Sequence, residues 1–404
     1  MSAGLLSQLD RYYAWVDDAQ DPIDPAEVAS LIVEPAHPIA ISAPIGQRRG
    51  WNLAAVVAAG VLVLAGAAAL LSTTARSAPP AATPLRIASP AELTWVRVPD
   101  AGATLDRPSE QSMFDVVEWD SQLVAVGSDG SDAAVWVSSD GVEWSKVPHD
   151  ESVFDGQGAS MAMASVTVAG PGLVAVGASE GPGADSRAVV WTSEDGVSWS
   201  RVPHDPLVFG TSSAYMADVT VGGPGLVAVG RHGNNAAVWT SADGSEWSRL
   251  PHDEAVFGGR FYRSMSRVAP GGPGLVAVGG RRFIDSFLPA VWTSRDGITW
   301  SQVADNGDLF DGCRGGMSAV AAKDTNLFAI GIGSSCESTN WAVWSASDGV
   351  TWFRRSEGPV LGTGNAQWMN DLAADSYGLI AVGGELVGDR PSPAAVSYTH
   401  LRAH

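Results

Sequence analysis

The hydrophobic and polar residues of this chain follow a short pattern that recurs over most of its length. In one unit, apolar residues gather in four short segments, at residues 163–170, 173–178, 188–193 and 199–203. Gly, Pro, Asn and Asp separate the segments, and none shows the 3.6-residue period of an amphipathic helix. The pattern therefore predicts four β-strands per unit and an all-β fold.

The unit repeats at a nearly constant interval. The Trp that follows each Asp-Gly pair recurs at intervals of 55, 48, 53 and 52 residues, at positions Trp144, Trp199, Trp247, Trp300 and Trp352. A period near fifty residues with four strands per unit is typical of a β-propeller built from four-stranded blades. We therefore expect each unit to form one blade.

The segment around each of these Trp residues predicts a tight turn between the third and fourth strands of a blade. Asp-Gly favours a hairpin turn, since Gly adopts positive φ easily and Asp accepts hydrogen bonds from nearby backbone N–H groups. The Trp offers a large apolar surface for packing against a neighbouring blade. We expect a structural role for the Asp of each turn, namely Asp140, Asp195, Asp243, Asp296 and Asp348.

These turns resemble the Asp-box repeat, also called the bacterial neuraminidase or BNR repeat. The family motif reads Ser-x-Asp-x-Gly-x-Thr-Trp, whereas this chain has Ser-x-Asp-Gly-x-x-Trp, with one residue fewer between Asp and Gly. The resemblance extends over residues 93–396 and implies a sialidase-like β-propeller. It also implies that the Asp box stabilises the fold and lies away from the active site of those members that are sialidases.

The ends of the repeat region bear on the number of blades. Residues 93–99 match a fourth strand without the three strands that normally precede it, five whole units follow, and a sixth ends near residue 396. If residues 93–99 complete the sixth blade, six blades close into a ring; a longer native chain would allow seven. Residues 397–404, "SYTHLRAH", break the repeat in mid-strand and are interpreted as a non-native tail.

A membrane-spanning helix is predicted before the repeats. Residues 53–71 contain no charged residue and are long enough to cross a hydrocarbon core as a helix. The expected organisation is a cytoplasmic tail at 1–50, a transmembrane helix at 51–72, a Pro/Ala/Ser-rich linker at 73–92 and the propeller at 93–396. Arg48 and Arg49 favour a cytoplasmic N-terminus. We therefore expect a single-pass protein of a bacterial cell membrane with an extracytoplasmic propeller.

The net charge and the cysteine content bear on the partners, disulfides and metals that this chain is expected to have. The net charge of -20 argues against nucleic acid as a partner, because a phosphate-binding surface needs a basic stripe. The only cysteines, Cys313 and Cys336, lie before the first and after the second expected strand of the fifth blade, which favours a disulfide over two free thiols. The recurring Met residues are interpreted as packing, and no metal or cofactor is expected.

Positions that vary between blades are the candidates for binding. Two residues after each recurring Met stand Asp115, Ser165, Asp218, Arg267, Ala319 and Asp371, a set that we call the channel level. If the first strands line a central channel, Asp115, Asp218, Arg267 and Asp371 form a candidate site for a cation or polar ligand. Structural hydrogen bonding is the alternative for these residues.

The fourth blade carries a second candidate surface. Two segments that flank its first two strands contain Arg260, Tyr262, Arg263, Arg281, Arg282 and Phe283. On an acidic chain, arginines beside aromatic rings favour an anionic or carbohydrate ligand, although pairing with neighbouring acids is an alternative. The "PHD" segments at His149, His204 and His252 are interpreted as turn caps.

These observations favour a membrane-anchored binding or interaction module with a carbohydrate or protein ligand. The alternative is a glycoside hydrolase of the exo-sialidase type, which the resemblance suggests. Such an enzyme uses an arginine cluster, a Tyr nucleophile with a Glu and an acid/base Asp, and no such set can be chosen from spacing here. We therefore expect a binding protein rather than an enzyme and assign no catalytic residue.

Overall fold

The computed structural model describes residues 111–156, 158–170, 172–181, 186–259, 262–283, 286–304, 315–335, 338–356, 367–374, 378–387 and 390–398. These residues form 23 strands and two short helices. They contain no helix that is both long and apolar enough to cross a membrane. The predicted transmembrane segment, the strand predicted at 93–99, both cysteines and Arg260 lie outside the described residues.

The strands form six antiparallel sheets, which we number in chain order. Sheet one contains β1 (Gln111–Trp119), β2 (Gln122–Asp129), β3 (Asp132–Ser138) and β4 (Ser145–Lys146). Sheet two contains β5 (Ser160–Ala169), β6 (Gly172–Glu180), β7 (Ser186–Ser193) and β8 (Trp199–Arg201). Sheet three contains β9 (Ala214–Gly222), β10 (Gly225–His232), β11 (Asn235–Ser241) and β12 (Trp247–Arg249).

The remaining sheets repeat this plan. Sheet four contains β13 (Arg263–Gly271), β14 (Gly274–Phe283), β15 (Ser286–Ser294) and β16 (Trp300–Gln302). Sheet five contains β17 (Met317–Lys323), β18 (Asn326–Ser335), β19 (Ser338–Ala346) and β20 (Phe353–Ser356). Sheet six contains β21 (Gln367–Ala374), β22 (Leu379–Val387) and β23 (Arg390–Tyr398). Helices α4 (Glu151–Phe154) and α5 (Pro206–Phe209) follow sheets one and two.

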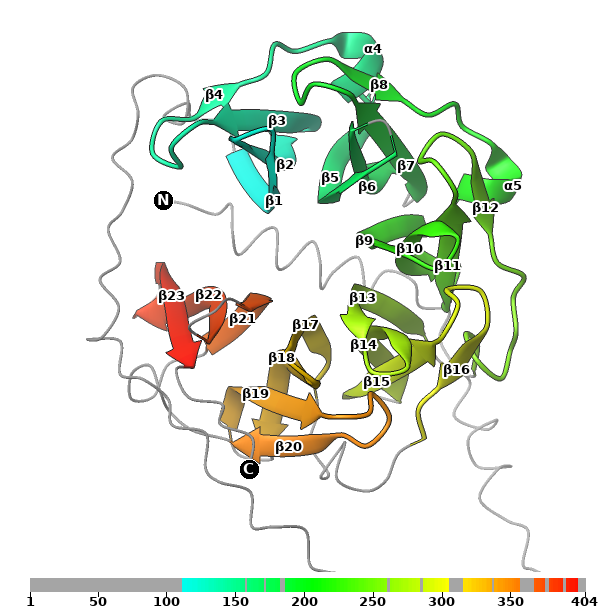
Figure 1. Ribbon diagram of the computed structural model, residues 1–404, viewed down its shortest axis with the longest axis vertical. Helices are drawn as coiled ribbons and strands as arrows, with labels where there is room; N and C mark the ends of the chain where they lie inside the picture. The colour runs from blue at the N-terminus through cyan, green and yellow to red at the C-terminus, as the bar shows by residue number, and fades with distance from the viewer. Residues whose placement is uncertain are drawn as a thin grey trace, which may run out of the picture. The chain divides into compact units, whose positions relative to one another are not determined.

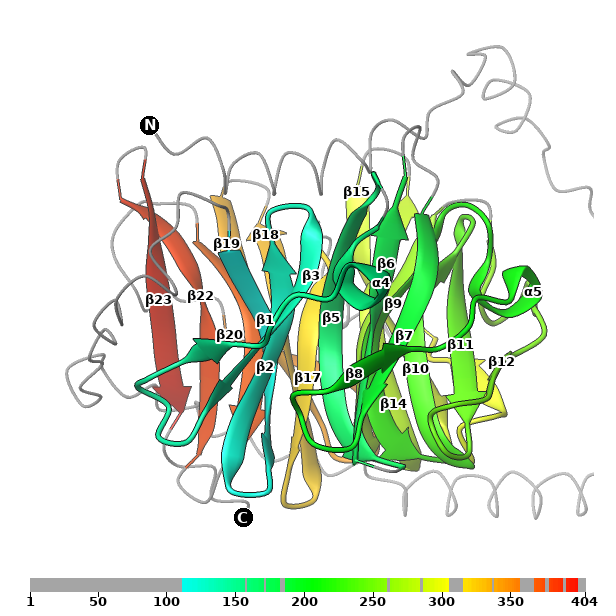
Figure 2. The same cartoon turned by 90° about the horizontal axis from the view of Figure 1, so that it is seen from above.

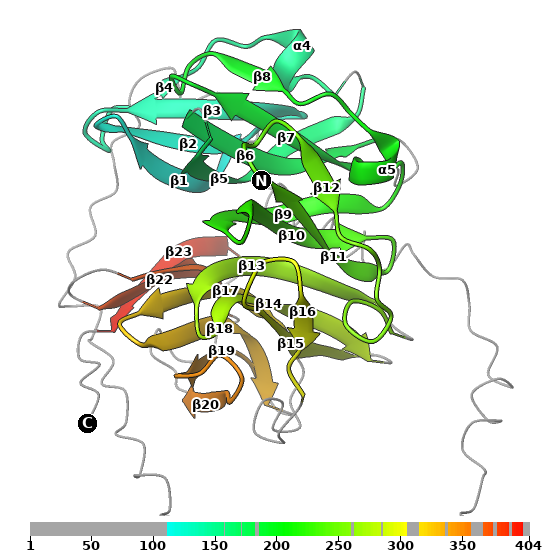
Figure 3. The ribbon, with the colours of Figure 1, turned by 45° about the vertical axis from the view of Figure 1, so that its right-hand side comes forward.

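The sheets are arranged radially, with the first strand of each sheet nearest the centre (Figure 1). Consecutive first strands contact one another from β1 through β5, β9, β13 and β17 to β21. The inner strands run along the axis of this arrangement (Figure 2), and the short fourth strands such as β8, β12 and β16 lie on the outside (Figure 3). The predicted all-β fold of four-stranded antiparallel sheets is confirmed for five sheets, and three strands are described in the sixth.

The turn before each fourth strand is held by its Asp, with a Ser that assists in sheets one to four. In sheet two, Asp195 Oδ1 accepts hydrogen bonds from the backbone N–H groups of Val197 and Ser198 at 2.8 and 2.6 Å. Ser193 Oγ accepts one from Gly196 N at 2.9 Å, and Gly196 has φ of 76°. The hydrogen bonds from Ser198 and Val197 lower the pKa of Asp195 to about 2. The same Asp contacts recur at Asp140, Asp243, Asp296 and Asp348.

In sheets two, three and four, a tryptophan connects the sheet to the one before it. Trp191, on β7, donates from Nε1 to the carbonyl oxygen of Val153 in α4 at 2.9 Å. Trp239 and Trp292 donate to Val208 and Val256 in the same way, at 2.7 and 2.8 Å. The bond of Trp191 is buried and the other two are partly buried, so these bonds fix neighbouring sheets while the tryptophan rings fill the space between them.

Each first strand carries a β-bulge directly after its Met. In sheet two the pairing register shifts between Met163 and Ser165, opposite Gly177. A Cβ atom at Gly177 would lie 2.0 Å from the carbonyl oxygen of Ala162, so the close approach of the two strands requires glycine. The bulge bends the strand and redirects the following side chain. The channel-level residues stand at this position in every sheet.

Candidate functional site

The channel-level residues of the first three sheets act as connectors between sheets. Asp115 Oδ2 accepts a hydrogen bond from Val166 N in sheet two at 2.9 Å. Asp218 Oδ2 accepts one from Val268 N in sheet four at 2.7 Å. Ser165 lies between them and donates from Oγ to Asp218 Oδ1 at 2.7 Å. The structural alternative therefore accounts for the hydrogen bonds of Asp115 and Asp218.

These two carboxyl groups lie in surroundings that oppose their ionisation. Burial raises the pKa of Asp218 to about 6, although the Arg267 guanidinium and the hydrogen bonds from Val268 and Ser165 oppose the increase. Burial also raises the pKa of Asp115, against the hydrogen bond from Val166 and the more distant charge of Arg267. Arg267 is therefore the positive charge that favours ionisation of both carboxyl groups, which belong to different sheets.

Arg267 and Asp371 connect sheets four and six at the same level. Arg267 Nε lies 3.9 Å from Asp371 Oδ1, and Arg267 Nη1 donates to the carbonyl oxygen of Ser266 at 3.1 Å. Sheet five, between them, contributes only the methyl group of Ala319 at this level. The structure thus brings the four predicted residues into one connected electrostatic group. The carboxyl groups of Asp115 and Asp218 already accept hydrogen bonds from backbone N–H groups.

A second group of side chains gathers where sheets three and four meet. The guanidinium carbon of Arg231, a residue with only 4% of its surface exposed, lies 5.3 Å from the ring centre of Tyr215 and 4.8 Å from that of Tyr262. The Tyr262 ring also meets Phe287 edge-on, with ring centres 6.1 Å apart. A guanidinium group between two aromatic faces is a favourable cation–π arrangement.

The arginines of sheet four extend this group. Arg263 and Arg281 face each other in the β13–β14 register, and Arg282 N donates to the carbonyl oxygen of Tyr262 at 2.7 Å. We call Tyr215, Arg231, Tyr262, Arg263, Arg281, Arg282 and Phe287 the basic-aromatic cluster.

Like charges act on one another within this cluster. Burial and the neighbouring Arg281 charge lower the pKa of Arg263, while Glu254 opposes this effect. Arg263 Nη1 also donates to Gln302 Oε1 at 2.7 Å. Burial raises the pKa of Glu180, and the Arg231 charge counteracts it. The cluster therefore brings four arginines together beside aromatic rings, an arrangement that suits an anionic partner.

The structure places most of the predicted residues of the fourth blade in this cluster, together with two residues of sheet three that sequence reasoning missed. Tyr262, Arg263, Arg281 and Arg282 lie together, whereas the side chain of Phe283, like Arg260, is outside what the structure describes. The missed residues, Tyr215 and Arg231, belong to sheet three and face each other in the β9–β10 register. A comparison of Arg231 with Ser128 and Ala178, its equivalents in earlier repeats, could have singled it out.

In the described residues, the arginines of the basic-aromatic cluster come from two sheets, and both tyrosine rings face a guanidinium group. The part of the chain that the structure describes holds no cluster of three or more His, Cys, Asp or Glu residues able to bind a metal ion.

Comparison with known proteins identifies the repeat region. A family model described as the DUF6242 beta propeller domain matches residues 89–361. No curated protein matches the chain. Among solved structures, Trypanosoma rangeli sialidase in complex with sialic acid is 16% identical, with a TM-score of 0.44 over 70% of this chain and 53% of the sialidase. A thermostable family-43 glycoside hydrolase is 10% identical, with a TM-score of 0.33 over 70% of this chain and 86% of that enzyme.

The similarity to solved structures has limited scope. This chain spans about half the length of the sialidase structures that it matches (53%). At identities of 10% and 16%, the likeness to hydrolases concerns the fold alone and leaves open whether this chain is an enzyme.

Proposed function

The chain belongs to the DUF6242 beta propeller domain family, and from this premise we propose that its propeller is a binding module for an anionic ligand, displayed outside the cell. The observation that carries this proposal is the basic-aromatic cluster, in which arginines of two sheets gather around tyrosine rings. On a chain with a net charge of -20, a local excess of cations needs a specific reason.

The arrangement of the cluster supports recognition rather than general charge. The two tyrosine rings and the buried Arg231 guanidinium hold one another in one orientation, which fixes the framework beside the arginines of sheet four. Arg263 and Arg281 repel each other, and an anion placed near both would relieve that repulsion. Aromatic rings next to charged groups also suit the apolar face of a sugar, so an acidic oligosaccharide fits both features.

An array experiment tests this function. The full chain, purified in a mild detergent, is applied to carboxylated and sulfated oligosaccharides and to their neutral counterparts. We expect retention on the acidic members and at least a tenfold loss of affinity in R263Q and R281Q, since each removes a charge-assisted contact. R295Q, which alters an exposed arginine in the sheet-four turn, serves as the control. Equal binding to neutral sugars, or unchanged binding by R263Q and R281Q, would contradict the proposal.

The hydrolase alternative has a direct test of its own. Turnover of a fluorogenic sialoside by the full chain would replace the binding function with an enzymatic one. We expect no turnover above that of a heat-denatured sample.

Anchoring by the segment at 51–72 is part of the proposed function. Its support is the uncharged run at 53–71 and the arginines before it. We expect the chain to remain in membranes after alkaline carbonate extraction and the propeller to be accessible to protease added outside spheroplasts. Release by carbonate, or protection of the propeller, would contradict this orientation.

We further propose that the ring closes by the pairing of residues 93–99 with sheet six, in a propeller of the Asp-box type. Support comes from repeat-equivalent positions on the face of sheet one. Val116 is 53% exposed, whereas its five equivalents are 5–8% exposed; these are Val166, Val219, Val268, Val320 and Leu372. Val382 of sheet six is likewise 40% exposed, and its equivalents in the other sheets are fully buried. Among the described residues, both faces therefore lack the neighbour that sheets two to five have on each side.

Trp136 provides the test of closure. Its Nε1 is buried without a hydrogen-bond partner among the described residues, although the equivalent Trp191 donates to the preceding connection. If the segment after residue 99 supplies the missing carbonyl group, W136F lowers the free energy of unfolding as much as W191F does. A much smaller loss for W136F would contradict closure by this segment.

A further inference from the structure

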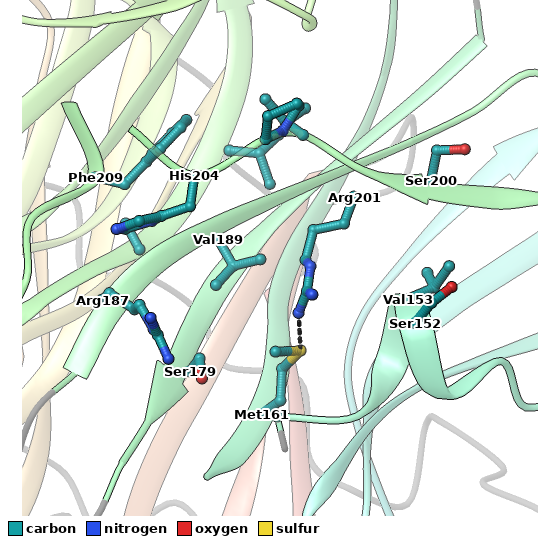
Figure 4. Close-up of a pocket in the computed structure, with 15 residues that line it drawn as sticks. Ser152, Val153, Met161, Ser179, Arg187, Val189, Ser200, Arg201, His204 and Phe209 are labelled. Carbon is teal, nitrogen blue, oxygen red and sulfur yellow. Dashed lines mark hydrogen bonds between the residues drawn. The ribbon is translucent and has the colours of Figure 1, made fainter. Parts of the chain in front are cut away.

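A cavity of about 540 Å³ is lined by residues of sheet two and of its flanking segments, and it shares no lining residue with the basic-aromatic cluster. Its walls come from β7, β8 and the two short helices that flank them. Figure 4 shows Arg187, Arg201, His204, Ser179 and Met161 among the lining residues, with the Arg201 side chain pointing toward the sulfur of Met161. Val189 and Phe209 add apolar surface to the same cavity. Its volume is within the range of small-molecule sites in proteins.

The two arginines that line this cavity have no carboxylate partner among the described residues. Within the described residues, neither Arg187 nor Arg201 forms an ion pair, in contrast to Lys146, His149, His252 and Arg267. The hydrogen bond of Arg201 goes to the sulfur of Met161, a weak acceptor, at 4.0 Å. Burial and then the charge of Arg187 lower the pKa of His204, and Arg201 adds a smaller effect in the same direction. Both guanidinium groups thus act on one imidazole ring.

A buried hydroxyl group faces the same space. Ser179 is only 2% exposed, it lines the cavity, and its Oγ has no hydrogen-bond partner among the described residues. A buried hydroxyl group without a partner is costly unless a ligand or water completes its hydrogen bonds. This group is therefore available to a ligand that enters between the arginines.

Comparison with sheet one shows how this cavity differs from its repeat equivalent. There, Asp129 and Asp132 occupy the positions of Ser179 and Arg187, as the pairing of β2 with β3 and of β6 with β7 shows. Asp129 forms an ion pair with Lys146, the equivalent of Arg201, and Asp132 lies 3.9 Å from His149. In sheet one, the positive charge of Lys146 is therefore balanced by an acid of the same sheet. In sheet two a serine and an arginine replace the two acids, so the same framework carries two positive charges.

From these four observations, we propose that the cavity of sheet two binds a carboxylate group on a small ligand with an apolar body. The two guanidinium groups bind the carboxylate, and the hydroxyl group of Ser179 donates a further hydrogen bond to it. Met161, Val189 and Phe209 contact the body of the ligand, which favours an organic acid over an inorganic anion. The site is separate from the basic-aromatic cluster, and the two proposals stand or fall independently.

Binding of a fluorinated aromatic acid tests the site. The probe is 4-(trifluoromethyl)benzoate, followed by ¹⁹F NMR with the full chain in detergent; 4-(trifluoromethyl)benzamide is its neutral isostere, and detergent alone gives the background. We expect the acid to bind at least tenfold more tightly than the amide. R187Q and R201Q each weaken binding of the acid at least tenfold, because each removes a charge-assisted contact.

Two further variants sharpen the test. R187D introduces the acid that sheet one carries at this position, so we expect it to abolish binding while the fold, followed by circular dichroism, is retained. R295Q removes an exposed arginine from another sheet and leaves binding unchanged. Equal binding of acid and amide, unchanged binding by R187Q and R201Q, or displacement of the benzoate by inorganic phosphate at a lower concentration than by unlabelled benzoate would each overturn the proposal.

Discussion

Replacement of Asp218 by asparagine should make the stability of this protein less dependent on pH. The carboxyl group is 8% exposed and accepts hydrogen bonds from Ser165 Oγ and Val268 N, each at 2.7 Å. An asparagine side chain fits the same space with its oxygen toward Val268 N and its amide group donating to Ser165 Oγ. D218N therefore removes the titration and keeps the connection between the sheets.

The size of the effect follows from the pKa of this group. Burial raises the pKa of Asp218 from 3.8 to about 6. Because the pKa of Asp218 is higher in the folded state, this carboxyl group stabilises the fold while it is protonated. The contribution is complete below pH 3.8 and is lost as the pH rises through about 6. The difference between 3.8 and about 6, at about 1.4 kcal/mol per pH unit, amounts to about 3 kcal/mol.

Urea denaturation of the full chain between pH 3.5 and 7.5 measures this effect. Other carboxyl groups titrate in both proteins, so the difference in free energy of unfolding between D218N and the parent isolates Asp218. We expect this difference to rise by about 3 kcal/mol in favour of D218N from the lowest to the highest pH. D195N is a control of opposite sign, since hydrogen bonds lower the pKa of Asp195 to about 2 and its ionised form stabilises the fold.

A difference that stays flat across this range would refute the reasoning, because it would mean that Asp218 ionises as easily in the folded chain as in the unfolded one. A difference that falls with increasing pH would refute it as well. That result would require the charge of Arg267 to outweigh burial, the opposite of the order inferred from the structure.

Three further predictions concern the connections between and within sheets. W191F should lower the free energy of unfolding by about 2–4 kcal/mol, since it leaves a buried carbonyl group unpaired and a void beside it; thermal and urea denaturation measure the loss. D195A should cost about 1 kcal/mol by removing the acceptor of two backbone N–H groups in an exposed turn, and a loss as large as that of W191F would contradict this ranking. R267Q should raise the pKa of Asp218 further, so that the pH-dependent loss of stability extends to higher pH in the same urea series.

The repeat architecture could be predicted from the sequence because it depends on local chemistry. Alternation of apolar residues sets the strands, and the Ser-x-Asp-Gly turns supply their own hydrogen bonds within a few residues, as around Asp195. Such features need no partner from a distant part of the chain. The four-stranded sheets and the positions of their turns followed from this pattern.

The role of the channel level could not be predicted in the same way. The sequence shows that the position occupied by Asp115 and Asp218 varies between repeats. The bulge after each Met determines that these two side chains reach the backbone of a neighbouring sheet. A bulge depends on the pairing of two strands, which an apolar pattern does not reveal.

The sequence and the tertiary structure each determined part of the candidate binding surfaces. The sequence by itself determined which residues carry charge and that Tyr262, Arg263, Arg281 and Arg282 share one end of a sheet. Only the tertiary structure decided that Arg231 of the neighbouring sheet lies between two tyrosines, and that Arg187 and Arg201 share a cavity without an acid among the described residues. The physical reason is that strand pairing within a sheet follows from local sequence, whereas the contacts between radially packed sheets depend on side chains about fifty residues apart, whose meeting only the assembled propeller fixes.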